Sequence, residues 1–231
     1  MNLKLLLLPL LLVPMSLPAL AQTAWRPLFN GQDLAGWKAN AYPDSWSVVD
    51  GAIRAHATKS CSHLFYVGDH ADGFERFKDF ELEVESRSEP DSNSGVFIHT
   101  DHATHPDGML RLLNGYEIQL NSSAIEKRKT GSLYAVVDLD VSPVDESQWF
   151  TTRITVRGQR ITVHLNDRLV VDYTEPANVE RPKDRAGRRL NPLGAAIALQ
   201  GHDPKSVFYF RSIKIRTLDA PASTSAQTTL R

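Results

Sequence analysis

Hydrophobic and polar residues alternate with a period of two along most of this chain. The alternation is clearest in FELEVES (80–86) and RITVHLN (160–166). Because successive side chains of a strand point to opposite faces, this pattern predicts strands with one buried face. Further strands are expected at 46–55, 63–67, 94–100, 115–121, 132–137, 148–157, 168–173, 194–201 and 206–216.

Turn residues separate these segments. Asp50-Gly51, Arg157-Gly158-Gln159 and Asn166-Asp167 are typical turn sequences, and they predict two hairpins that join 148–157, 160–166 and 168–173 in order. No segment of 10–15 residues shows a helical period of 3.6. Many short strands with frequent turns indicate an all-β sandwich or barrel, with long loops at 101–113 and 174–192.

The N-terminal 21 residues have the pattern of a signal peptide. Lys4 precedes an apolar run from Leu5 to Val13, and Ala19-Leu20-Ala21 has the small residues that signal peptidase recognises. The run is shorter than the roughly 20 apolar residues of a membrane span. We therefore expect cleavage after Ala21 and a periplasmic or secreted protein.

The length and composition of the rest of the chain indicate one domain with no overall charge that would attract nucleic acid or anionic membrane. Residues 22–217 suit a single β-sandwich, and the small polar residues of 218–231 predict a disordered tail. The formal net charge of −1 favours neither nucleic acid nor anionic membrane. Cys61 is the only cysteine, so no internal disulfide is expected.

Polar residues on predicted strands give the first site candidates. Glu117 and Gln119 in GYEIQLN share the face opposite the apolar residues, where they could hold sugar hydroxyls or supply a base. Gln200 and His202 share a face beyond the strand GAAIAL, and histidine transfers protons near neutral pH. The alternatives are an ordinary solvated strand and a polar strand end.

Arg211 is the third candidate, in VFYFRSIKIR. Strict alternation would place it on the apolar face with Ile213 and Ile215, where a buried charge needs a partner. It could pair with Glu117 or hold a carbonyl oxygen, or it could form a purely structural ion pair.

Three other charged clusters have simpler interpretations. Glu81, Glu83 and Glu85 resemble a glucanase acidic strand, but their alternation with apolar residues favours a solvated face. The histidines and aspartates of 99–107 fit no strong metal pattern. The basic run RPKDRAGRR (181–189) is expected to be a solvated loop.

An ordered series of motifs resembles the 3-keto-disaccharide hydrolase domain family over most of 24–217. The series is RPLFNGQDLAGWKA (26–39), SWSVVDGAIRA (45–55), FKDFELEVESR (77–87), NSGVFIH (93–99), GYEIQL (115–120), KTGSLY (129–134), ITVHLN (161–166), and IALQGHD followed by VFYFRSIKIR. The resemblance implies a concanavalin A-like jelly-roll β-sandwich. It also implies a hydrolase or lyase that cleaves glycosides of sugars oxidised at C3.

The resemblance also implies site residues. Glu117, His202 and Arg211 would be catalytic, and His99, Gln119, Lys129, Tyr134 and Gln200 would bind substrate. His99 stands where the family commonly has arginine, which affects the expected substrate contacts.

The implied reaction removes the C2 proton, eliminates the C1 oxygen and then hydrates the enone. Either Glu117 or His202 would be the base, and either Arg211 or Lys129 would stabilise the enolate. No cofactor is expected and the expected partner is a carbohydrate, although a divalent metal stays an alternative. The rival functions are a non-catalytic, lectin-like carbohydrate-binding domain and an ordinary β-glucanase.

Overall fold

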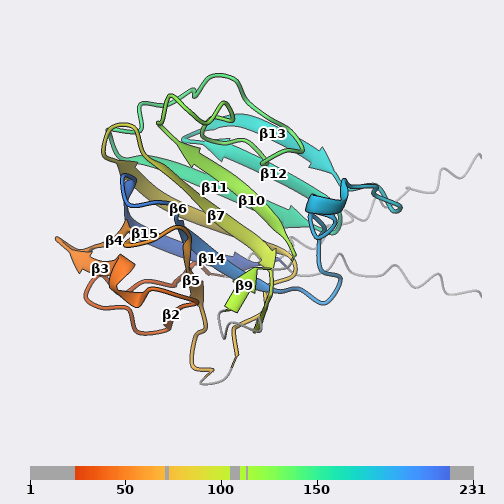
Figure 1. The fold of residues 1–231 in the computed structure, drawn as a ribbon. Helices are drawn as coiled ribbons and strands as arrows, with labels where there is room; N and C mark the ends of the chain where they lie inside the picture. The colour runs from red at the N-terminus through yellow and green to blue at the C-terminus, as the bar shows by residue number, and fades with distance from the viewer. Residues whose placement is uncertain (1–23, 71–72, 105–109, 113, 219–231) are drawn as a thin grey trace, which may run out of the picture.

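The protein is an all-β sandwich of two antiparallel sheets, as the period of two predicted. The computed structural model describes residues 24–70, 73–104, 110–112 and 114–218, without the side chains of 102–104, 110 and 111. The two sheets pack face to face as layers (Figure 1). This is the jelly-roll architecture that the family resemblance implied.

The larger sheet has eight strands in the order β13-β12-β11-β6-β15-β4-β3, with β1 also paired to β15. Its strands are β1 (Arg26–Pro27), β3 (Trp46–Val49), β4 (Ala52–His56), β6 (Phe80–Ser88), β11 (Phe150–Arg157), β12 (Arg160–Leu165), β13 (Arg168–Thr174) and β15 (Val207–Thr217). Both predicted hairpins are confirmed, because β11 pairs with β12 and β12 pairs with β13.

The smaller sheet has five strands in the order β10-β7-β14-β5-β2. They are β2 (Trp37–Ala39), β5 (Ser62–Tyr66), β7 (Asn93–Thr100), β10 (Tyr116–Asn121) and β14 (Ala196–Gly201). A separate hairpin of β8 (His102–Thr104) and β9 (Leu110–Leu112) lies within the segment expected to be a long loop.

The core lies between the two sheets. Phe80, Leu82 and Val84 of β6 are fully buried, while the intervening glutamates are partly exposed. The inner residues of β10, Tyr116, Ile118 and Leu120, are also fully buried. In β7, β10 and β14, however, every residue is buried, so both faces of the smaller sheet are covered.

Two strand predictions need correction. The segment 46–55 is a hairpin, because Asp50 and Gly51 both adopt positive φ and reverse the chain between β3 and β4. The segment 132–137 is not a strand. Leu133 makes isolated bridges to Ile118 and Val137, because a tight turn brings Val137 back to Leu133.

The predicted signal peptide and the tail beyond Leu218 lie outside the described residues, as do His105 and Asp107 of the 99–107 cluster and the side chain of His102. Within the described part of the chain, no helix is long and apolar enough to cross a membrane.

Candidate functional site

Polar side chains gather on the outer face of the five-stranded sheet. Glu117 and Gln119 project from β10, and Gln200 projects from β14. The register places Gln119 opposite Gly95 on β7, and Gln200 opposite His63 on β5. These polar residues therefore form a band across the sheet, and each of their side chains is buried.

A cavity of about 240 Å³ opens over this band. Its lining brings together five of the predicted site residues: Glu117, Gln119, Tyr134, Gln200 and His202. The other lining residues, which the sequence did not identify as site residues, are Cys61, Asn93, Glu126 and Arg188.

Glu117 is a buried carboxylate with one cationic partner. Nη2 of Arg188 donates to Oε2 of Glu117 at 3.1 Å. Burial raises the pKa of Glu117 above its ordinary value, and the nearby Arg188 charge opposes that rise. Gly95 leaves the space that this carboxylate needs, because a Cβ there would lie 2.9 Å from Oε1 of Glu117.

His202 forms a dyad with Asp203 beside the same cavity. Nδ1 of His202 and Oδ2 of Asp203 are 2.7 Å apart, and the Ser206 hydroxyl also donates to Oδ2 at 2.8 Å. Burial alone would raise the pKa of Asp203, but these hydrogen bonds lower it. The ionised carboxylate therefore fixes a proton on Nδ1, and Nε2 can exchange a proton with a ligand.

Several buried polar atoms of this face have no hydrogen-bond partner among the described residues. They are Oε1 of Gln119, Oε1 of Gln200 and both ring nitrogens of His63. Burial lowers the pKa of His63 to about 3, so its ring is neutral at physiological pH. An unsatisfied buried polar group is costly, so bound water or a ligand would complete the hydrogen bonding of these atoms; of their residues, Gln119 and Gln200 line the cavity.

Arg188 comes from the basic loop 181–189, which the sequence suggested would be solvated. That interpretation is wrong for Arg181 and Arg188, whose side chains are half-buried and hydrogen-bonded. Nε of Arg181 donates to the Arg188 carbonyl at 3.1 Å. Nη2 of Arg181 also donates to the hydroxyls of Tyr116 at 2.9 Å and Tyr173 at 2.7 Å. Arg181 thus ties the loop to two strands and fixes the residue that pairs with Glu117.

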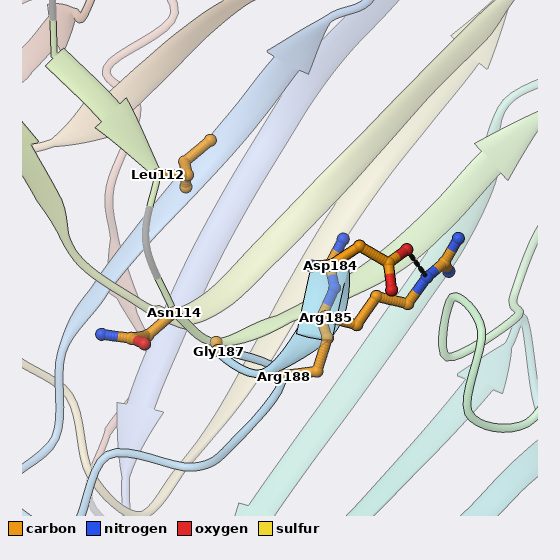
Figure 2. Close-up of a pocket in the computed structure, with 7 residues that line it drawn as sticks. Leu112, Asn114, Asp184, Arg185, Gly187 and Arg188 are labelled. Atoms are coloured by element: carbon orange, nitrogen blue, oxygen red, sulfur yellow. Dashed lines mark hydrogen bonds and ion pairs between the residues drawn. The ribbon is translucent and has the colours of Figure 1, made fainter. Parts of the chain in front are cut away.

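Residues within 184–188 of this loop also line a hollow of about 150 Å³ together with Leu112, Asn114 and Gly115. Figure 2 shows Asp184 and Arg185 paired with each other on the short 3₁₀ turn, η2 (Lys183–Arg185), with Gly187 and Arg188 next to it. The Gly115 amide donates to the Gly187 carbonyl at 2.9 Å, which holds the loop against the start of β10.

Arg211 does not lie at this site. A bulge between Phe210 and Ser212 interrupts the pairing of β15 with β6, so the alternation of β15 shifts by one residue. Arg211 consequently points to the outer face of the eight-stranded sheet, where it pairs with Glu85 and stacks over Trp149. The predicted contact with Glu117 is wrong.

Lys129 and His99 are also placed away from the cavity. Nζ of Lys129 donates to the carbonyls of Ser123 and Glu126, at 2.6 and 2.9 Å, so it fixes a loop. Nε2 of His99 donates to the Lys78 carbonyl at 2.8 Å, toward the far end of β7 from Asn93. The geometry gives neither residue a direct contact with a ligand beside Glu117.

Comparison with known proteins identifies the family. The 3-keto-alpha-glucoside-1,2-lyase-like domain matches residues 24–216. This chain belongs to that family. No protein of curated function matches the chain in sequence.

Solved structures resemble this 3-keto-alpha-glucoside-1,2-lyase-like domain across its length. A candidate glycosyl hydrolase from Parabacteroides distasonis is 21% identical with a TM-score of 0.67, and 84% of this chain covers 94% of that one. A second from the same organism is 25% identical with a TM-score of 0.62, covering 85% and 100%. The exoplasmic/lumenal domain of VIP36, bound to Ca²⁺ and Man3GlcNAc, shares only the fold at 13% identity, a TM-score of 0.52 and coverage of 84% and 92%.

Among the described residues of this domain, no three His, Cys, Asp or Glu side chains lie where they could jointly hold a metal ion. The expectation that no cofactor is needed stays a prediction.

Proposed function

We propose that this protein cleaves 3-keto-glycosides by removing the C2 proton, eliminating the C1 oxygen and hydrating the resulting enone. The family and the two glycosyl hydrolase-like neighbours support an activity on glycosides. One observation carries the mechanism: a buried carboxylate held by a guanidinium shares a cavity with His202, whose ring is paired with Asp203.

Glu117 is the proposed base. Its raised pKa makes the ionised carboxylate more basic than an exposed glutamate, and the C3 ketone acidifies the C2 proton. When the C2–H bond breaks, its electron pair moves to the C3 oxygen as an enolate. Arg188, in place of the Arg211 or Lys129 expected from the sequence, stabilises that negative charge because its guanidinium already lies against the cavity.

His202 is the proposed acid. The enolate electrons re-form the C3 carbonyl and make the C1–C2 double bond, while the C1–O bond breaks. The proton on Nε2 of His202 passes to the leaving oxygen, and Asp203 stabilises the ring during the transfer. Water then adds at C1 and a proton returns to C2, which completes hydrolysis.

The polar band orients the sugar. Gln119 and Gln200 offer unsatisfied acceptor oxygens to sugar hydroxyls, and the Gln119 amide is fixed because Nε2 donates to Oδ1 of Asn93 at 3.1 Å. Tyr134 lines the same cavity, where its hydroxyl donates to Oε2 of Glu126 at 3.2 Å.

The decisive experiment compares a 3-keto-glucoside with the same glucoside unoxidised. We expect turnover of the ketone alone, and exchange of its C2 proton with solvent deuterium or release of the enone. Turnover of both compounds without exchange would indicate direct hydrolysis instead. Binding without turnover of either would support the lectin-like alternative.

We further propose that the protein is exported with cleavage after Ala21. N-terminal sequencing of the secreted form should begin at Gln22, and a form that begins at Met1 would contradict this.

A further inference from the structure

A second cavity adjoins the one above Glu117. It has a volume of about 290 Å³ and shares three lining residues with the first: Asn93, Glu126 and His202. The two cavities therefore lie side by side, with His202 at their junction. Pockets for whole small molecules begin at roughly 300 Å³. Each of these two cavities is slightly smaller, so each has room for one part of a ligand, about the size of a sugar ring.

Ile125 lines the second cavity and is a highly exposed apolar residue on a loop held by hydrogen bonds. Its side chain is 88% exposed, although the loop that carries it is tightly held. Lys129 donates to the carbonyls of Ser123 and Glu126, and Nδ2 of Asn121 donates to the Glu126 carbonyl at 2.8 Å. The loop is thus fixed on both sides of an exposed apolar residue.

A lone exposed apolar side chain usually needs no explanation. Ile125 differs because it stands at a cavity that continues into the proposed reaction site. Asp91 and Lys205 line the same cavity with a carboxylate and an ammonium group. An apolar surface beside a few polar groups is the combination that binds a ring with C–H faces and hydroxyl edges.

We infer that this second cavity is the subsite for the leaving group, and that the group is a ring with an apolar face, either a second sugar or an aromatic aglycone. The inference rests on the proposed function. With the oxidised sugar above Glu117, the bond to be broken lies at the junction, where His202 protonates the leaving oxygen. Ile125 packs against the ring beyond it, so glycosides with a ring aglycone are better substrates than methyl glycosides.

The test measures kcat/KM of wild type, Ile125→Asp and Leu193→Asp on three substrates. These are a 3-keto-disaccharide, a phenyl 3-keto-glucoside and a methyl 3-keto-glucoside. Leu193 is a matched control, because its side chain is 80% exposed and it follows Asn191, whose amide bonds to His99 toward the opposite end of β7. We expect Ile125→Asp to lower kcat/KM about tenfold or more for the disaccharide, the phenyl glucoside or both, the size of a lost apolar contact. Its kcat/KM for the methyl glucoside should stay within about twofold of wild type.

The pattern of losses identifies the natural ring. A loss confined to the disaccharide indicates a second sugar, and a loss confined to the phenyl glucoside indicates an aromatic aglycone. Equal losses for all three substrates, or no loss for either ring substrate, would overturn the subsite. The same holds if Leu193→Asp reproduces the effect.

Failure of the reaction itself would look different. If wild type turns over none of the three compounds, the proposed chemistry is wrong and the subsite is judged by calorimetric binding of the unoxidised disaccharide and methyl glucoside. Weaker disaccharide binding in Ile125→Asp, with methyl glucoside binding unchanged, would support the subsite. Unchanged disaccharide binding would overturn it.

Discussion

The outer polar residues of one sheet are partly exposed and paired with opposite charges, whereas those of the other sheet are buried. On the eight-stranded sheet, each glutamate of β6 faces a basic residue on a neighbouring strand. The pairs are Glu81 with Arg216, Glu83 with Arg153 and Lys214, and Glu85 with Arg211. These charges remain partly exposed, and such pairs are typically worth only about 0–1 kcal/mol each.

On the five-stranded sheet, the outer polar residues are covered. Glu117 and Gln119 are buried as deeply as core residues, and several acceptor atoms of this face lack partners within the described structure. The loops that carry Arg188 and Tyr134 line the cavity above this face. Both faces follow from the same alternation, so burial of the polar side is what distinguishes the face of the candidate site from the solvated face.

The largest contrast should come from matched glutamates on the two faces. We expect Glu117→Gln to lower kcat/KM for a 3-keto-glucoside by about 10²–10⁴-fold, because that is the usual contribution of a positioned base. Glu83→Gln removes a carboxylate of the same type from the solvated face and should stay within about tenfold of wild type. A loss of several orders of magnitude in Glu83→Gln would instead favour the glucanase mechanism.

The second contrast uses the two arginines. Arg188→Gln should lower kcat/KM by about 10²–10³-fold, because it removes the donor at the developing enolate. Arg211→Lys changes a residue that the family resemblance implied to be catalytic, but it should stay within about twofold, because Arg211 lies on the other sheet. Equal losses in the two variants would remove the distinction between the faces.

The pH profile sharpens the same prediction. Glu117 must be ionised to act as a base, so kcat/KM should fall as the pH drops through its pKa. Arg188 lowers that pKa against the larger effect of burial. In Arg188→Gln the acid limb should therefore move to higher pH, and an unmoved limb would show that Glu117 is not the base.

The regular parts of this comparison could be predicted from the sequence. Alternation in FELEVES placed Phe80 in the core and Glu81 outside, and alternation in GYEIQLN placed Glu117 and Gln119 on one face. Arg211 was misplaced because a one-residue bulge in β15 reverses alternation without any mark in the sequence. Arg188 was missed because its partner is 71 residues away and the two meet only through loop packing.

A smaller effect is expected from Gly95→Ala. The new Cβ would lie 2.9 Å from Oε1 and 3.1 Å from Cγ of Glu117, so the carboxylate must shift. A displacement of a reacting group by about 1 Å can cost on the order of a hundredfold, and we expect kcat/KM to fall about ten- to a hundredfold. Gly73→Ala is the control, because among the described residues, apart from its chain neighbours, none places a heavy atom within 4 Å of its Cβ position. Full activity of Gly95→Ala would show that the carboxylate position is not critical.

The smallest effect tests how the loop positions Arg188. Arg181 bonds the Arg188 carbonyl and the hydroxyls of Tyr116 and Tyr173, so Arg181→Gln should let Arg188 move away from Glu117. We expect kcat to fall about fivefold, the equivalent of one hydrogen bond of about 1 kcal/mol. Arg181→Lys should not restore it, because an ammonium group cannot reproduce the planar set of donors.

The decisive measurement for Arg181 is again the acid limb of the pH profile. If Arg181 only stabilises the fold, Arg181→Gln lowers the melting temperature and leaves the limb where it is in wild type. If Arg181 positions Arg188, the limb moves to higher pH, in the same direction as in Arg188→Gln but by less, because Arg188 is displaced and not removed. Arg160→Gln, which breaks an exposed pair with Asp172 on the other sheet, should change neither kcat nor the limb.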